Sequence, residues 1–182
     1  MLRARVRLPT GVRELSVERG GAALVDGPHA DVVVGALLDR DPAAEEVELA
    51  GTSIRRLDVA ARARRGLAVV GTGSVAPDLS VRDHLAAVTT PTRADELLAD
   101  APLLAGRSGA PAGVLSGGER RVLGFLRAQA LDPVVVVLNR AGAGLDDDVL
   151  DWAGRRTASW RQHGIALVVR PARPEERGWA RS

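Results

Sequence analysis

Short apolar runs alternate with segments of helical pattern along this sequence, and this alternation limits the possible folds more than any other feature. The runs that we expect to form strands are residues 22–25, 47–49, 67–70, 134–138 and 165–169. Runs that are apolar throughout are typical of strands buried on both faces, which occur in sheets covered by helices. Helical segments between such strands indicate crossover connections. We therefore expect an α/β fold with a mostly parallel sheet.

The segments of helical pattern lie between these runs. We expect helices at residues 32–38, 59–65, 81–88, 94–98, 116–130 and 146–160. Residues 105–113 are rich in Gly, Pro, Ala and Ser and read as a loop. The arginine- and proline-rich stretch from Arg170 onward is expected to be frayed or laid on the surface.

The composition excludes several kinds of catalytic and metal site. All 25 basic residues are arginine, and cysteine is absent. Without lysine there is no Schiff base and no phosphate loop completed by an ammonium group. Without cysteine there is no disulfide, thiolate nucleophile or Cys-type zinc site. The formal net charge is only +2 with both signs interspersed, so an ordinary solvated surface is favoured over a nucleic-acid interface.

Length and hydropathy favour one domain over residues 1–182. The opening residues, MLRARVRLPTGV, hold arginines but no apolar stretch, so we expect no secretory signal. The longest apolar runs are far shorter than the roughly 18 residues that a membrane span needs. We therefore expect a cytoplasmic protein.

One segment resembles a known family. The sequence LSGGE before an expected helix, followed by the strand at 134–138 and then by Gly144-Leu145-Asp146, resembles the signature motif and D-loop of ATP-binding cassette (ABC) transporter ATPases. The sequence from Asp78 to Leu85 is most similar to that of the ATPases of branched-chain amino-acid importers. The resemblance implies a P-loop NTPase-like core, with a shortened helical subdomain at about residues 75–115 that ends at the signature.

The resemblance also implies roles for six residues. In that family the signature binds the ATP held by the opposite subunit, and the D-loop touches that subunit. The residues implied in ATP binding across the interface are Leu115, Ser116, Gly117, Gly118 and Glu119, with Asp146 as the D-loop contact. The chemistry suits an anion, because Ser116 is expected to cap a helix whose glycines expose backbone amides.

The residues that bind phosphate in the family's phosphate loop are replaced in this chain. A GxxxxGK[ST] loop would begin at Gly27, which places Val32, Val33 and Val34 at the glycine, lysine and hydroxyl positions. Valine has no donor for a phosphate and resists the backbone geometry that exposes amides. Asp31 adds negative charge beside the expected phosphates. We expect no ATP to be held by this loop.

The hydrolytic residues of the family are also replaced. Asn139 and Arg140 stand where the family has the Asp-Glu pair that serves Mg²⁺ and the general base. Thr72, or a neighbour in this shortened loop, stands for the Q-loop glutamine, and Arg170 stands for the switch histidine. The resemblance therefore assigns no catalytic residue and no metal ligand to this chain.

Two functions from different classes remain open. The first is a pseudo-ATPase that binds no cofactor itself and supplies its signature to ATP and Mg²⁺ at the interface with an active ABC ATPase subunit. The second is a non-catalytic scaffold or regulatory module, and a residual ATPase is the least favoured alternative. The first function implies a heterodimer, with a homodimer as an alternative. It also implies a possible set of permease subunits, which would place the protein on the inner face of the plasma membrane.

Other candidate groups are better explained structurally. The three acids at 146–148 suit the start of a helix, where they oppose the macrodipole. His29, His84 and His163 share no ligand spacing. Arg62, Arg64 and Arg65 lack interleaved aromatic residues, so we expect a solvated helix face.

Overall fold

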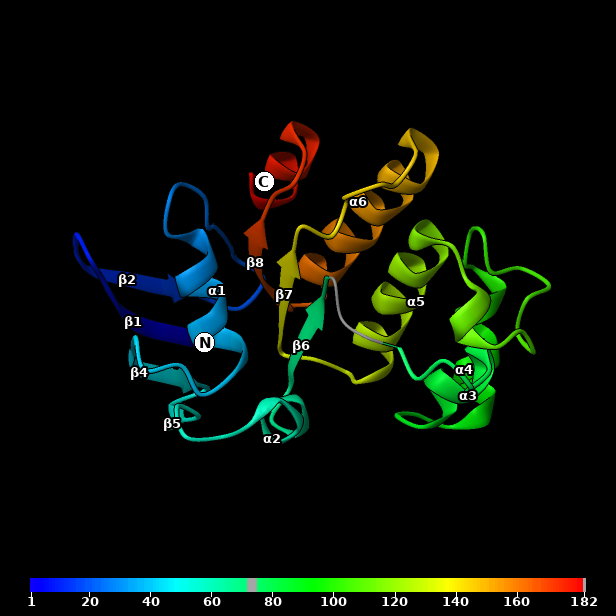
Figure 1. Ribbon diagram of the computed structural model, residues 1–182, viewed down its shortest axis with the longest axis horizontal. Coiled ribbons are helices and arrows are strands. Elements are labelled where there is room, and N and C mark those ends of the chain that lie inside the picture. Colours follow the sequence, from blue (N-terminus) through cyan, green and yellow to red (C-terminus); the bar gives the residue numbers. More distant parts are fainter. Residues whose placement is uncertain (72–74, 182) are drawn as a thin grey trace.

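A computed structural model describes residues 1–71 and 75–181 of the chain. It contains two four-stranded sheets (Figure 1). The antiparallel sheet has the order β2-β1-β4-β5, and the parallel sheet has the order β3-β8-β7-β6. The elements of the antiparallel sheet are β1 (Leu2–Leu8), β2 (Gly11–Val17), β4 (Ala44–Leu49) and β5 (Thr52–Ser53). Those of the parallel sheet are β3 (Ala22–Leu24), β6 (Leu67–Val70), β7 (Val135–Asn139) and β8 (Ala166–Arg170).

Six α-helices and two 3₁₀ helices lie in the described part of the chain. They are α1 (Ala30–Leu38), α2 (Val59–Arg64), α3 (Val81–Ala86), α4 (Pro91–Ala99), η1 (Ala112–Val114), α5 (Gly117–Ala130), α6 (Asp147–Gln162) and η2 (Pro174–Ala180). Figure 1 shows α5 and α6 beside the parallel sheet, with α3 and α4 beyond α5. None of the described helices is long and apolar enough to cross a membrane.

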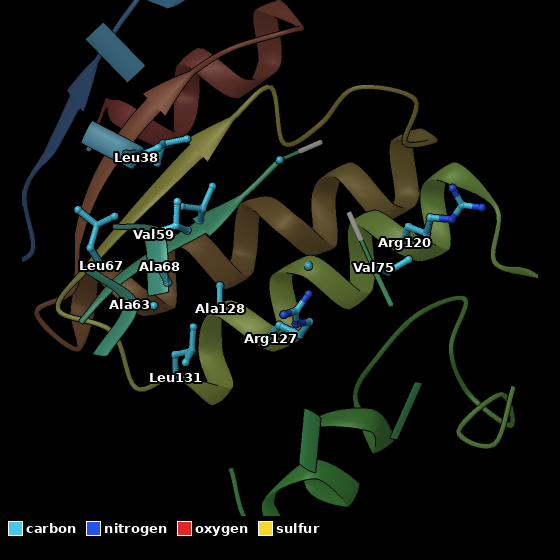
Figure 2. Close-up of a pocket in the computed structure, with 13 residues that line it drawn as sticks. Leu38, Val59, Ala63, Leu67, Ala68, Val75, Arg120, Arg127, Ala128 and Leu131 are labelled. Atoms are coloured by element: carbon cyan, nitrogen blue, oxygen red, sulfur yellow. The ribbon is translucent and has the colours of Figure 1, made fainter. Parts of the chain in front are cut away.

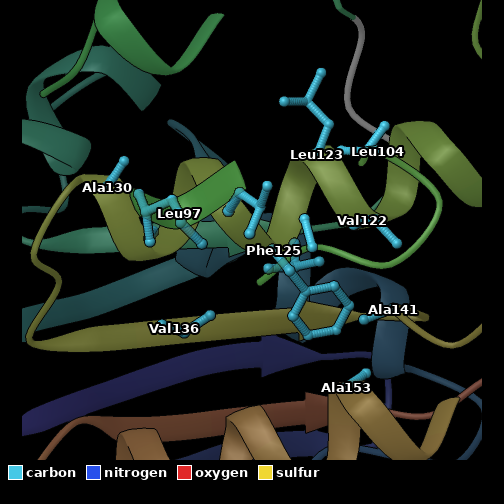
Figure 3. Packing of buried hydrophobic residues seen from close by; sticks show 14 of the residues in the cluster. Leu97, Leu104, Val122, Leu123, Phe125, Ala130, Val136, Ala141 and Ala153 are labelled. Carbon is cyan, nitrogen blue, oxygen red and sulfur yellow. The ribbon is translucent and has the colours of Figure 1, made fainter. Parts of the chain in front are cut away.

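The parallel sheet separates two hydrophobic cores, because successive residues of a strand point to opposite faces. Val135 and Val137 of β7 join the core shared with α1 and the antiparallel sheet. Val136 and Leu138 join the core shared with α5 and α6, which Figure 3 shows around Phe125. Both faces are covered, so the prediction of parallel strands buried on both sides is confirmed.

The antiparallel sheet was not expected from the sequence. In β1, Leu2, Ala4 and Val6 are buried, whereas the arginines between them are exposed. The strand pairs with β2 from Leu2–Val17 to Leu8–Gly11. The period-2 alternation of apolar residues with arginine was the signal available for this strand.

Of the two expectations for the segment after Arg170, frayed or laid on the surface, the first was wrong, because the segment is helical and anchored by two buried side chains. Residues 174–180 form η2, and Trp179 is buried with its ring 6.3 Å from that of Phe125. The buried carboxylate of Glu176 accepts hydrogen bonds from the backbone N–H groups of Gly142, Ala172 and Arg173 at 2.8–3.0 Å. These three bonds offset the cost of burying the charge and fix the segment to the loop after β7.

The expected solvated face of α2 was wrong at Arg62. Arg64 and Arg65 are exposed, but Arg62 is fully buried. Its guanidinium donates to the carbonyls of Ala36 and Leu37 at the end of α1, and to those of Arg55 and Leu57. A helix leaves its last carbonyls without intrahelical partners, so this cation satisfies groups that the fold would otherwise bury unpaired.

Candidate functional site

The signature segment, residues 115–119, forms the entry to α5. Leu115 is 2% exposed and anchors the segment in the core, whereas Ser116 and Gly117 are exposed. Ser116 Oγ accepts a hydrogen bond from Glu119 N at 3.2 Å, and Glu119 Oε2 accepts one from Ser116 N at 2.7 Å. This reciprocal capping box confirms the prediction that Ser116 caps the helix.

Glu119 has a second partner. Its Oε1 accepts a hydrogen bond from the Arg107 guanidinium, which lies in the loop before η1. The bond from the Ser116 backbone N–H lowers the pKa of Glu119, and the Ser116 side chain and Arg107 add to this effect against the opposing effect of burial. The carboxylate is therefore ionised at neutral pH and holds the loop and the helix together.

The two glycines leave the start of α5 open. A methyl group at Gly117 would meet no atom within 4 Å, and one at Gly118 would meet Leu103 Cδ1 at 3.5 Å. N–H groups in the first turn of a helix have no intrahelical acceptor, and the helix dipole is positive there. The amides of Gly117 and Gly118 therefore lie at an exposed end that can receive an anion.

The structure brings the D-loop residues next to the signature segment. A methyl group at Gly118 would lie 4.0 Å from Gly144 O and from Leu145 Cδ2. Asp146 is exposed and caps α6, with Oδ1 accepting from Val149 N at 2.9 Å. A contact of Asp146 with another subunit remains a prediction.

The region aligned with the phosphate loop has a different structure from that of a nucleotide site. Helix α1 begins at Ala30, two residues before Val32, which stands at the position of the family's second glycine. Val33, at the lysine position, is 0% exposed, and Val34 is 2% exposed. Both valines belong to the core beneath the antiparallel sheet. The three valines are therefore part of a packed helix rather than a loop that wraps an anion.

The ends of β7 and β8 meet α1 in the Arg170 cluster, which consists of Asp31, Asn139 and Arg170. The Arg170 guanidinium forms an ion pair with Asp31 and donates to Asn139 Oδ1 at 3.1 Å. Arg140 N donates to Arg170 O at 2.7 Å, and Arg140 has a left-handed backbone with φ of 55° and an exposed side chain. Ligands of open α/β sheets bind at the carboxyl ends of the strands, and here the protein's own charges meet at that place.

Two more arginines hold the loop between β3 and α1. Arg177 donates to the Asp26 carboxylate at 2.8 Å, and Arg13 donates to Asp26 O at 3.2 Å. The grouping of Asp26, Arg13 and Arg177 was not predicted, because these residues come from three distant parts of the chain. Only the Asp26-Gly27 turn was a local signal.

The residues at this end of the sheet do not fit a magnesium nucleotide. The amide oxygen of Asn139 already accepts from Arg170, and the acid in the first turn of α1 would repel phosphate. Residue 72, aligned with the Q-loop glutamine, lies outside the described residues.

Some of the other candidate residues have structural partners. Asp147 pairs with Arg173 at 2.9 Å in the first turn of α6. His84 is buried with Nε2 2.9 Å from Ala76 O, and His163 Nδ1 lies 2.8 Å from Ser159 O. Across residues 1–71 and 75–181, no three His, Asp or Glu side chains are grouped to hold a metal ion.

Comparison with solved structures finds this fold in ATP-binding cassettes of ABC transporters. A nucleotide-free cassette has a TM-score of 0.78 at 16% identity, covering 96% of this chain and 82% of that chain. A dimeric cassette in a post-hydrolysis state, bound to ADP and Pi, has a TM-score of 0.78 at 17% identity, covering 98% and 91%. A cassette in its ADP conformation has a TM-score of 0.73 at 14% identity, covering 97% and 82%. No protein-family model and no curated protein sequence matches the chain. At these identities the likeness establishes the fold, which is that of an ATP-binding cassette.

Proposed function

We propose that this chain, which has the fold of an ATP-binding cassette, is a degenerate ABC ATPase subunit that supplies its signature segment to ATP held by an active partner subunit. It binds no nucleotide in its own phosphate-loop region. Its contribution to the partner is the exposed start of α5, with Ser116 and the amides of Gly117 and Gly118 directed to an anion.

The observation that carries the proposal is the contrast between the two regions. The Arg170 cluster has its charges paired internally beside a row of packed valines. The signature segment keeps an exposed helix start beside the D-loop residues Gly144 and Leu145. This contrast supports the proposal that one half of a composite site has been lost and the other half kept.

The partner follows from this asymmetry. Two copies of this chain would place two signature segments opposite two regions that do not fit ATP, so a homodimer would have no working site. A heterodimer with an active subunit would have one. One cassette of the same fold is dimeric with ADP and Pi bound, which supports pairing as the working form. Permease subunits would join through that heterodimer.

A scaffold or regulatory role is the second candidate, and one observation favours it. Ser116 Oγ and both carboxylate oxygens of Glu119 are already used in bonds within the chain. These bonds stabilise the start of α5. The signature residues therefore have a structural role that does not require ATP.

The test measures ATPase activity of the chain purified with its active partner. Ser116→Arg should abolish the activity, as should Gly117→Arg, which leaves the capping box intact because space around Gly117 is open. We expect a loss of about 100-fold or more, as when a transition-state donor is removed. Ser159→Arg, on the exposed face of α6, is the matched control and should leave the rate unchanged.

Two results would decide against the proposal. An unchanged rate in the Gly117→Arg complex, with the subunits still co-purifying, would favour the scaffold. Binding of ATP to the isolated chain in equilibrium titration would instead favour a residual ATPase.

A further inference from the structure

A groove of about 250 Å³ lies between α2, the edge strand β6 and α5 (Figure 2). Strand β6 has β7 on one side and is the last strand of the parallel sheet on the other. Neither the signature segment nor the Arg170 cluster takes part in the walls of the groove.

The floor of the groove is one stripe of α5. Arg120, Gly124, Arg127, Ala128 and Leu131 line it, and their spacing of three or four residues places them on the same face of the helix. Gly124 and Ala128 lie in the middle of this stripe, and their small side chains leave the space empty. A methyl group at Gly124 would make only an ordinary contact of 3.7 Å with Val70.

The other walls are apolar. Val59 and Ala63 of α2 and Leu67 of β6 face the groove, as Figure 2 shows. Val59 is 51% exposed, which places an apolar side chain at the opening. Apolar surface of this kind favours a hydrocarbon ligand.

Two arginines line the groove: Arg120 donates to Gly113 O at 3.2 Å, whereas Arg127 has no partner among the described residues. Its Nε is buried without a hydrogen bond, and no described carboxylate forms an ion pair with its guanidinium. Burial lowers the pKa of Arg127, as expected for a cation whose hydration is lost without compensation. The fully buried Arg62 differs, since four carbonyls accept from it. An anion that enters the groove would supply what Arg127 lacks.

We propose that this groove binds a medium-chain monocarboxylate, with its carboxylate on the Arg127 guanidinium and its alkyl chain over Gly124, Ala128 and Leu131. The groove volume of about 250 Å³ is just below the roughly 300 Å³ at which sites for drug-sized ligands begin. A smaller ligand, with a chain of about eight to ten carbons, therefore suits it. A planar guanidinium is a good match for a carboxylate, which it can bind with two parallel bonds.

Isothermal titration calorimetry of the isolated chain tests this with three probes. Octanoate should bind with a Kd of about 0.1–1 mM, as expected for a ligand of this size. Octanol, which keeps the chain, and acetate, which keeps the carboxylate, should each bind at least about tenfold more weakly. The assay needs neither ATP nor a partner subunit. Its result therefore tests the groove separately from the proposed function.

Two pairs of variants locate the site. Arg127→Gln should weaken octanoate at least about tenfold, whereas Arg64→Gln, an exposed arginine of α2 outside the groove, should not change it. Val59→Glu, which places an anion at the opening, should also weaken it. Val12→Glu, at a comparably exposed valine of β2, is its control.

Octanoate affinity unchanged in both Arg127→Gln and Val59→Glu would overturn the proposal. Equal affinity for octanol would also overturn it, because the guanidinium would then play no part. Failure of octanoate to bind would overturn it in favour of a segment of a partner protein as the occupant.

Discussion

In the proposed function, the Arg170 cluster and the signature segment belong to the two halves of a composite site, and their charges are arranged in opposite ways. In the Arg170 cluster, cation and anion belong to the same chain and satisfy each other. In the signature segment, Glu119 is satisfied internally while the helix start beside it stays exposed. Exposure of backbone donors, rather than the presence of charge, therefore distinguishes the two regions.

The burial of the aligned positions differs as well. Val33 is enclosed in a core, whereas Gly117 has open space on its outer side. A substitution is therefore expected to have different effects in the two regions, and the predictions below use this difference.

The largest effect is expected where a charge would enter the core. Val33→Lys places an ammonium at a position with 0% exposure and no described acid to receive it, so it should lower the free energy of unfolding by about 3–5 kcal/mol. Urea unfolding measures this change, and titration with ATP should show no binding.

Val32→Lys is the matched control. Val32 is adjacent in α1 and only partly buried, so a lysine there can extend to water and should cost about 1 kcal/mol. Equal costs for the two variants, or ATP binding by the Val33→Lys variant, would show that the valine row is not a packed part of the core.

A smaller effect is expected at Glu119. Glu119→Gln weakens the capping box and the pairing with Arg107, so it should cost about 1–2 kcal/mol at pH 7. The pKa of Glu119 in the folded protein lies below its ordinary value of 4.5, so its stabilisation is present above that pH and is lost as the pH falls through the folded pKa.

The difference in unfolding free energy between Glu119→Gln and the parent should therefore shrink between pH 6 and pH 3. Glu96→Gln, which breaks the exposed pair with Arg93 on α4, is the control and should cost less than about 0.5 kcal/mol. A pH-independent difference at Glu119 would mean that shape rather than charge holds the start of α5.

The smallest effect is expected from the pairing of Asp31 with Arg170. The Asp31 side chain is 74% exposed, so a double-mutant cycle with Asp31→Asn and Arg170→Gln should give a coupling of about 0.5 kcal/mol. None of the three variants should bind ATP, because the packed valines remain. Binding by any of them would show that this ion pair alone excludes the nucleotide.

The parallel half of the fold could be predicted from the sequence. The β-branched run ending at Leu138 corresponds to β7, and Ser116 and Asp146 begin helices as expected. These elements have purely local signals, namely continuous apolar residues and capping side chains.

The rest depended on contacts between distant residues. Strand β1 had a local signal in its alternation of apolar residues with arginine, but its pairing with β4 joins segments about 40 residues apart and had none. Arg62 looked like a surface residue because the carbonyls that bury it belong mostly to α1 and to the turn before α2. The pairing of Arg170 with Asp31 likewise joins residues that have no common sequence pattern.

The strand order has a consequence for synthesis of the chain. Strand β3 is made early, but its partner in the sheet is β8, and the two pair from Ala22–Leu167 to Leu24–Val169. Contacts so distant in sequence form slowly, because a long segment must be ordered before they contribute. The antiparallel sheet has all its strands within the first third of the chain and can assemble while the ribosome is still translating the parallel one. In nascent chains, we therefore expect the apolar face beneath α1 to stay exposed to solvent until β7 and β8 emerge from the ribosome.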